Sequence, residues 1–314
     1  MSEQTVLVTG ATGFLGSHLV RRLLSDGYQI IILKRSFSNT WRIEDLLHLP
    51  HLVTYDLDLC SIQQPFQDFK KIHTIIHTAT VYGRKQESVC EVLEANTVFP
   101  LRLLELGVKF STYNFLNTDT FFNKNEIPYK GLINYSLSKE QFREWGEQFS
   151  IAEKINFVNL RLEQVFGAYD DKHKLIPYFV QQLLENVPQL QLTRGEQKRD
   201  FIYIDDVVSA YVFLLKKAYH MPFSYQEYEV GTGQSISLRK FLEMTKKVIN
   251  ANTELRFGAL PYRNNEIMDS KANIVDLEQL GWTPTISLEE GISATVKSEK
   301  QKRFSNIQFP GEDI

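Results

Sequence analysis

Two short segments of this sequence carry residue types that together could move a hydride and a proton. One is Thr9-Gly10-Ala11-Thr12-Gly13-Phe14-Leu15-Gly16, which follows an apolar opening, and the other is Tyr135-Ser136-Leu137-Ser138-Lys139. The second segment places a phenol and an ammonium four residues apart, which is one turn and one face of a helix. A phenol beside a cation can exchange a proton with a ketone or alcohol while a bound nicotinamide exchanges the hydride. The pair of segments therefore indicates redox chemistry.

The glycine segment predicts a dinucleotide-binding turn. Its glycines stand where a strand passes into a helix, so the backbone can turn tightly and approach a pyrophosphate. The spacing is GxxGxxG and not the commoner GxGxxG, and an ordinary tight turn is the alternative explanation. The position directly after the first strand favours cofactor binding. We expect the cofactor contacts of this segment to come from Gly10, Thr12, Gly13, Phe14, Leu15 and Gly16.

The end of the second expected strand bears on which dinucleotide binds. It reads Leu33-Lys34-Arg35-Ser36, whereas NAD sites usually have an acid there to hold the ribose hydroxyls. The cations Lys34 and Arg35 favour NADPH over NAD because they attract a 2′-phosphate, although two solvated basic residues are the simpler explanation. Asp56, followed by Leu57, comes after the third strand. It could accept a hydrogen bond from an adenine amine, and a plain loop role is equally open.

Composition restricts the class of protein. The 314 residues are 43% hydrophobic with a formal net charge of −3, which argues against a protein built to coat nucleic acid. Cys60 and Cys90 have no CxxC spacing and the histidines are scattered, so we expect a reducing compartment and no metal site. The chain shows no signal peptide pattern and no apolar run that could span a bilayer. A soluble cytoplasmic protein is our expectation.

Alternating strand and helix patterns predict an α/β fold with a Rossmann-type, doubly wound parallel sheet. We expect strands near residues 6–8, 28–33, 52–55, 74–78, 113–118, 156–160, 201–204 and 228–230, and helices near 14–25, 88–106, 135–149, 175–185 and 205–216. The alternation loosens after Gly167. The expected domains are a dinucleotide-binding domain of 1–167 with about 199–221 and 228–233, a smaller C-terminal substrate lobe of about 168–198 and 234–298, and a loosely held tail over 299–314.

The order of these segments resembles the extended short-chain dehydrogenases/reductases (SDRs) of the nucleotide-sugar epimerase, dehydratase and reductase group. Further matches are His77-Thr78-Ala79-Thr80 to HxAA, Asn96 to a helix asparagine, 161–167 to RxxNxYG, 199–206 to RDFxxVxD, and 281–284 to GWxP. The resemblance covers nearly the whole chain. It implies the family fold and adds Ala79 and Asn96 to the cofactor contacts.

The resemblance also implies roles in the reaction. Tyr135 becomes the general acid for a ketone oxygen, and Lys139 lowers the pKa of that phenol and holds the cofactor ribose. Alignment with the STDxVY pattern assigns the third catalytic residue, a hydroxyl, to Thr118, with Thr120 second. The 4,6-dehydratases of the group have Glu at the position of Thr120, so the resemblance argues against an elimination.

Within the group, the segments 115–122, 161–163, 195–201 and 263–268 resemble reductases of CDP-4-keto-3,6-dideoxyglucose. Those enzymes make CDP-sugars, the 3,6-dideoxyhexoses of bacterial lipopolysaccharide O-antigen. The resemblance implies a set of substrate contacts, each with surface or core packing as its alternative. Phosphate contacts are expected from Lys174 with Leu175, Arg199 and Arg263, and sugar contacts from Tyr82, Thr120 and Gln164, the last in place of the family asparagine.

Three functions remain open on the sequence. The first is an NADPH-dependent 4-ketoreductase of a nucleotide deoxysugar, the second a nucleotide-sugar 4-epimerase with bound NAD, and the third a non-catalytic NADPH-binding sensor.

The resemblance also implies a homodimer, because the family pairs two helices of each subunit in a four-helix bundle. The outer apolar stripe of these helices would consist of Ala95, Val98, Leu101, Phe142, Trp145 and Phe149. The alternative is that these side chains belong only to the core.

Overall fold

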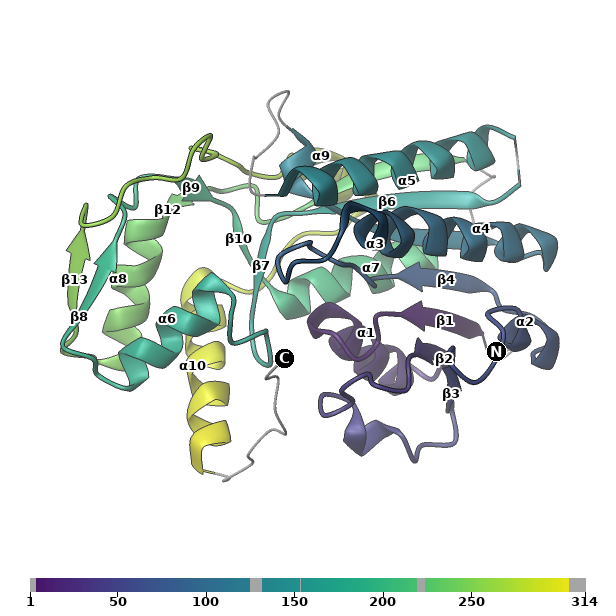
Figure 1. The fold of residues 1–314 in the computed structure, drawn as a ribbon, viewed down its shortest axis with the longest axis horizontal. Coiled ribbons are helices and arrows are strands. Elements are labelled where there is room, and N and C mark those ends of the chain that lie inside the picture. Colours follow the sequence, from purple (N-terminus) through teal and green to yellow (C-terminus); the bar gives the residue numbers. More distant parts are fainter. Residues whose placement is uncertain (1–3, 125–131, 153, 219–223, 305–314) are drawn as a thin grey trace. The chain divides into compact units, whose positions relative to one another are not determined.

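The computed structural model describes residues 4–124, 132–152, 154–218 and 224–304 (Figure 1). The chain divides into two compact units, Met1–Leu162 with Val208–Val230 and Glu163–Val207 with Gly231–Ile314. We call them the first and the second unit. The expected domain boundary differs, because 163–167 and 199–207 lie in the second unit. The reason is that β7 (Gln164–Phe166) and β10 (Phe201–Tyr203) pair with each other in parallel and stay outside the large sheet.

The first unit contains a seven-stranded parallel sheet of order β11-β6-β5-β4-β1-β2-β3. Its strands are β1 (Thr5–Thr9), β2 (Gln29–Lys34), β3 (Leu52–Asp56), β4 (Thr74–His77), β5 (Asn114–Thr120), β6 (Asn156–Leu162) and β11 (Tyr225–Val230). The chain extends the sheet from β1 first to one side and then to the other. Such a reversal leaves a crevice at the carboxyl ends of β1 and β4, where doubly wound folds bind ligands. The predicted Rossmann-type fold is confirmed.

Helices cover this sheet and supply its core. They are α1 (Phe14–Ser25), α2 (Gln64–Asp68), α3 (Val89–Leu93), the π-helical segment η2 (Glu94–Val98), α4 (Phe99–Lys109), α5 (Ile133–Ile151) and α7 (Ile204–Ala218), with 3-10 turns η1 (Glu44–Leu46) and η3 (Phe121–Lys124). The single helix expected over 88–106 is therefore interrupted by a π-helical turn. Gly146 lets α5 approach β6, because a Cβ there would lie 2.2 Å from the Phe157 ring.

The apolar residues of α4 and α5 correct part of the expected dimer stripe. Phe142 is fully buried in the core with Phe115 and Phe157, and Leu101 and Phe149 pack against the same cluster. Phe142 is therefore core and not an outward-facing residue. Trp145, the largest of the six side chains in the expected stripe, is about half exposed (49%).

The second unit has three small sheets and four helices within the described residues. Besides β7 with β10, β8 (Gln189–Leu192) pairs in parallel with β13 (Glu254–Phe257), and β9 (Lys198–Arg199) pairs antiparallel with β12 (Ile236–Ser237). The helices are α6 (Leu175–Leu184), α8 (Leu238–Ile249), α9 (Val275–Leu280) and α10 (Leu288–Phe304). α10 continues to Phe304 and so takes up the first part of the expected tail, whose residues 305–314 lie outside the described part.

Across the described ranges, no helix is both long and apolar enough to cross a membrane.

Candidate active site

The glycine turn joins β1 to α1 with very close backbone packing. Gly10 has φ +66°, and a Cβ on it would lie 2.6 Å from the amide nitrogen of Ala79. A Cβ on Gly16 would lie 2.1 Å from the carbonyl oxygen of Gly10. Gly13 is the N-cap of α1 and has no side chain to accept from the first N–H groups of the helix. An anionic group can take that place, so the loop suits a pyrophosphate.

At the end of β2 the predicted cations are paired with acids from the turn after β3. Lys34 Nζ lies 2.9 Å from Asp56 Oδ2, and Arg35 Nε lies 3.5 Å from Asp58 Oδ1. The hydrogen bond from Lys34 is the main cause that lowers the pKa of Asp56. Asp56 also accepts from Ser36 Oγ and from the N–H of Asp58. Its carboxylate therefore organises the β2 and β3 ends, a role that competes with the predicted adenine contact.

Leu57 and Ala79 lie beside the same sheet edge. The N–H of Leu57 donates to the carbonyl of Lys34, and its side chain packs on the hydrophobic core. Ala79 touches the glycine turn through its backbone, with its N–H 3.4 Å from Thr9 Oγ1. Of these two predicted cofactor residues, Ala79 adjoins the pyrophosphate loop, whereas the Leu57 side chain packs into the core.

Asn96 forms hydrogen bonds inside the protein with all of its side-chain polar atoms. Its side chain is fully buried, and Nδ2 donates to the carbonyl of Val81 and to Ser138 Oγ at 2.8 and 3.0 Å. Its Oδ1 accepts from the N–H of Val81 and from Thr80 Oγ1. With donors and acceptor both occupied inside the protein, Asn96 ties the segment after β4 to α5. The cofactor contact expected of Asn96 stays a prediction.

Tyr135 and Lys139 lie together near the start of α5, and both are buried. Lys139 Nζ donates to the carbonyl of Thr118 at the end of β5 over 3.0 Å. Burial lowers the pKa of Lys139 to about 8, and the negative charge of Asp119 opposes this. Burial also raises the pKa of Tyr135 well above its ordinary value, with a further contribution from Tyr82. The phenol therefore carries its proton at neutral pH, as a general acid must.

The expectation that Lys139 sets a low pKa for Tyr135 needs correction. Burial has the largest influence on the phenol and raises its pKa, while the hydrogen bond with Thr120 and the charge of Arg84 oppose it. The Tyr82 ring lies 4.8 Å from the Tyr135 ring, and the Arg84 guanidinium lies over Tyr82. Tyr82 is thus placed next to the reacting phenol, as predicted for a residue that lines the sugar site.

The two candidate hydroxyls of β5 have different partners. Thr118 Oγ1 donates to the carbonyl of His77 and lies 2.7 Å from the Tyr211 hydroxyl of α7, in a structural set of contacts. Thr120 Oγ1 accepts from the N–H of Phe122 at 3.3 Å, and the Thr120 side chain acts on the Tyr135 phenol as a hydrogen-bond partner that lowers its pKa. The alignment placed Thr118 first and Thr120 second. Both side chains lie on the same face of β5, and Thr120, the last residue of the strand, is the one next to Tyr135.

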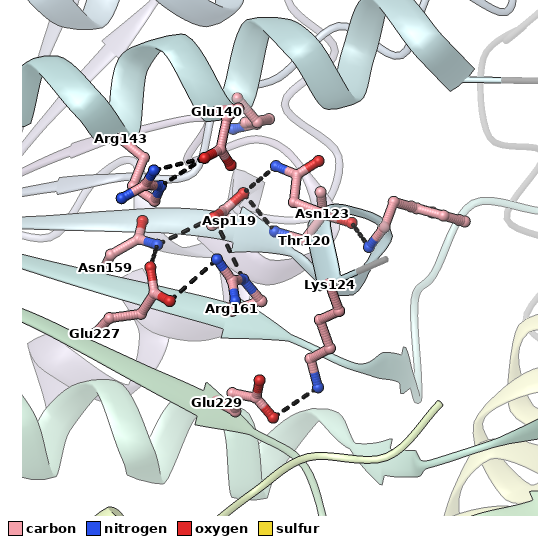
Figure 2. A network of polar contacts seen from close by, with 12 residues as sticks. Asp119, Thr120, Asn123, Lys124, Glu140, Arg143, Asn159, Arg161, Glu227 and Glu229 are labelled. Atoms are coloured by element: carbon pink, nitrogen blue, oxygen red, sulfur yellow. Dashed lines mark hydrogen bonds and ion pairs between the residues drawn. The ribbon is translucent and has the colours of Figure 1, made fainter. Parts of the chain in front are cut away.

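A network of polar side chains at the carboxyl ends of β5, β6 and β11 was missed by the sequence reasoning (Figure 2). Its centre is Asp119, which is 2% exposed and accepts from Asn159 Nδ2 at 3.0 Å, with Arg161 Nε at 3.7 Å. Arg161 also pairs with Glu227 at 3.0 Å. Charged and amide residues at alternate positions of three strands of the sheet, Asn117 and Asp119, Asn159 and Arg161, and Glu227 and Glu229, are the sequence signal that could have revealed it.

In the second unit, the predicted phosphate-binding cations are themselves paired. Arg199 lies 2.6 Å from Glu266, with both side chains largely buried, and Lys174 lies 2.8 Å from the buried Asp170. Burial raises the pKa of Asp170 while Lys174 opposes that shift. The remaining predicted substrate residues of this unit are Arg263, which is exposed, Leu175 at the start of α6, and Gln164 on β7, which is half-buried.

Among the described residues, no three His, Cys, Asp or Glu side chains converge in a way that could hold a metal ion.

Comparisons with known proteins agree with this architecture. The pattern of the NAD dependent epimerase/dehydratase family matches residues 6–231. CDP-abequose synthase from Salmonella muenchen is 39% identical over 291 residues, covering 92% of this chain and 96% of that protein. The enzyme of the same name from Salmonella typhimurium is 36% identical, covering 94% and 98%. A UDP-glucose 4-epimerase structure from Thermotoga maritima has a TM-score of 0.82 at 22% identity, covering 96% and 100%, a likeness of fold.

Proposed function

Because the chain belongs to the NAD dependent epimerase/dehydratase family, we propose that it is an NADPH-dependent 4-ketoreductase of a nucleotide-activated deoxysugar. The substrate proposed first is CDP-4-keto-3,6-dideoxyglucose, which would give CDP-abequose or the sugar with the opposite C4 configuration. The observation that carries this proposal is the 39% identity with a CDP-abequose synthase over 92% of the chain. The place of action would be the cytoplasm, in the supply of sugars for O-antigen.

The chain's own residues fit the protonation half of such a reduction. A reduced nicotinamide, when bound, supplies the hydride for C4. Tyr135 holds its proton at neutral pH and gives it to the ketone oxygen, so that the product is an alcohol. The Thr120 hydroxyl orients the phenol and can polarise the same carbonyl. Lys139, which contacts the backbone beside Thr120, provides a cation for the phenolate that remains.

The cofactor site would be formed by the glycine turn and the end of β2. The N–H groups at the start of α1 suit the pyrophosphate, and Arg35 suits a 2′-phosphate because its side chain is 61% exposed and its ion pair with Asp58 is long. Lys34 is more enclosed and paired with Asp56. Arg35→Ala should raise the KM for NADPH and leave the KM for NADH nearly unchanged. An equal effect on both cofactors would argue against NADPH selectivity.

The proposed substrate contacts in the second unit are Arg199, Arg263 and Lys174 for the two phosphates. Arginine binds phosphate oxygens through two N–H groups at once, which suits a diphosphate. Gln164 and Leu175 would contact the remainder of the substrate. Tyr82 in the first unit, stacked beside Tyr135, would contact the sugar ring.

We also propose a homodimer that pairs the outer faces of α4 and α5. Leu137 and Trp145 on α5 are 54% and 49% exposed, and Leu93 on the neighbouring α3 is 38% exposed. Large apolar side chains grouped on neighbouring helices favour burial by a second copy. Sedimentation of wild type and Trp145→Glu tests this, with the variant expected to be monomeric. A monomeric wild type would refute the dimer.

The test of the reaction is oxidation of NADPH, followed by its absorbance, with CDP-4-keto-3,6-dideoxyglucose as substrate. Wild type should oxidise NADPH and Tyr135→Phe should not, and NMR of the product then gives the C4 configuration. No net oxidation by a protein that carries tightly bound NAD and interconverts C4 epimers would establish the 4-epimerase instead. Dinucleotide binding without turnover of any keto-sugar would establish the non-catalytic sensor.

A further inference from the structure

One buried carboxylate lies next to the reacting groups and has no part in the proton transfer described above. Asp119 Oδ1 accepts from the N–H of Thr120 at 2.8 Å and from Asn123 Nδ2 at 3.2 Å. Its Oδ2 accepts from Asn159 Nδ2, and Arg161 lies on the same side. All of these neighbours are donors or cations. Burial raises the pKa of Asp119, and Asn159, Arg161 and the N–H of Thr120 oppose that rise. A protonated Asp119 would have to donate, so this set of partners favours the ionised carboxylate.

The backbone on both sides of Asp119 is held by hydrogen bonds to charged side chains. The carbonyl of Thr118, which precedes it, accepts from Lys139 Nζ at 3.0 Å. The N–H of Thr120, which follows it, donates to the Asp119 side chain. The end of β5 is therefore held between an ammonium and a carboxylate. This arrangement presents the Thr120 hydroxyl to Tyr135.

The same network returns to the helix that carries Tyr135 and Lys139 (Figure 2). Asn159 Nδ2 also donates to Glu227, which accepts from the Tyr225 hydroxyl at 2.8 Å. Arg143 of α5 contacts that hydroxyl at 3.4 Å and is hydrogen-bonded to Glu140, the residue after Lys139. Hydrogen bonds thus run from β5 through β6 and β11 to α5. Removing the central carboxylate would release several buried donors at once.

We propose that Asp119 is a positioning residue for the reduction: its carboxylate fixes Thr120 against Tyr135 and provides the counter-charge for the buried Lys139 ammonium. The proposal rests on the function proposed above. It differs from proton transfer by Asp119 itself, because all its oxygens face donors. The other titratable groups around Lys139 are His77 of β4, whose pKa burial and Lys139 lower well below its ordinary value, and Tyr135 of α5.

The first test compares Asp119→Asn with Glu229→Gln. Glu229 is a matched control because it is a partly buried carboxylate of the same sheet, on β11, 2.7 Å from Lys124. Asp119→Asn keeps the size but turns an amide N–H₂ toward donors, so kcat should fall about 100-fold with little change in the KM for NADPH. In the pH profile of kcat, the alkaline limb of Asp119→Asn should lie at lower pH than that of wild type. The reason is that loss of the Asp119 carboxylate lowers the pKa of Tyr135 and of Lys139. Glu229→Gln should change neither property.

A third variant separates charge from position. Asp119→Glu retains the anion but moves it by one methylene, so the alkaline limb should stay near that of wild type while kcat remains reduced. If Asp119→Asn folds with an unchanged kcat and an unchanged alkaline limb, the positioning role is refuted. A reduced kcat with the wild-type pH profile in Asp119→Asn would refute the counter-charge part.

The second test uses no substrate and so distinguishes this proposal from the proposed reaction. NMR of protein labelled at the lysine side-chain carbons follows the titration of Lys139, assigned by comparison with Lys139→Arg. Wild type should titrate at about pH 8, Asp119→Asn at lower pH, and Glu229→Gln as wild type. If wild type fails to oxidise NADPH, the reductase proposal fails while this titration still decides the role of Asp119. Equal midpoints in wild type and Asp119→Asn would overturn that role.

Discussion

The two units hold their functional charges in different ways. In the first unit, Asp119 is surrounded by donors from β5, β6 and the turn after β5, so its geometry is set by many partners. In the second unit, Arg199 and Lys174 each face a carboxylate, Glu266 and Asp170. Arg199 also donates to the backbone carbonyls of Lys198 and Ile267. A network with many partners is suited to keeping reacting groups in place before substrate arrives. A cation that faces an acid can also bind an incoming phosphate. The acid then keeps the arginine or lysine ordered but lowers the affinity of the protein for the phosphate.

The largest expected effect is at the centre of the first unit. Tyr135→Phe should lower kcat by about 1,000-fold, because the ketone oxygen then lacks its proton donor. Dinucleotide binding should persist, since the glycine turn is untouched. Steady-state NADPH oxidation and a fluorescence titration with NADPH measure the two properties. A variant that keeps a tenth of the wild-type rate would mean that another group supplies the proton.

The second prediction concerns the stability cost of the buried ammonium. Because the pKa of Lys139 falls from 10.5 to about 8 in the folded protein, Lys139→Met should stabilise the fold at pH 7 by up to about 3 kcal/mol while turnover is lost. Between pH 8 and 10.5 the unfolded wild type binds more protons than the folded one, so wild-type stability rises and the advantage of the variant shrinks. Urea unfolding at pH 7 and pH 10 checks this. A variant that is less stable at both pH values would contradict it.

The third prediction separates the two threonines of β5. Thr120→Val should lower kcat about 30-fold, because Tyr135 loses its hydroxyl partner. Thr118→Val should change kcat little and lower stability by about 1–2 kcal/mol, since the buried Tyr211 hydroxyl loses its partner. Kinetics and denaturant unfolding of both variants test the assignment. The reverse pattern would restore Thr118 as the catalytic hydroxyl.

The smallest effect is expected in the second unit, where it tests the sharing of a cation directly. Arg199→Ala should raise the KM for the nucleotide sugar about tenfold with little change in kcat. Glu266→Gln should leave that KM unchanged or lower it, because Arg199 loses a competing anion. Both KM values follow from initial rates at saturating NADPH. If Glu266→Gln raises KM as much as Arg199→Ala does, the pair acts as one positioned unit and the contrast between the two units disappears.

Several parts of the site could be predicted because they depend on local spacing. The glycines between β1 and α1 follow from a tight turn, and the i, i+4 spacing of Tyr135 and Lys139 follows from one helical turn. The role of Asn96 could not be read from the sequence, because an amide in a helix has the same sequence signature whether it meets a ligand or the protein backbone. In the structure, the hydrogen-bonding groups of the Asn96 side chain all have partners within the protein.

The sequence by itself determined the alternation of strands and helices, the dinucleotide turn and the tyrosine–lysine pair, because each is specified by residues close together in the chain. Only the tertiary structure decided which threonine faces Tyr135 and which groups surround Asp119. Those answers depend on the strand order β5-β6-β11, which brings Asp119, Asn159 and Glu227 together although they are 40 and 68 residues apart in turn. They also depend on burial, which sets the charge states of Tyr135 and Lys139 and has no local signature in the sequence.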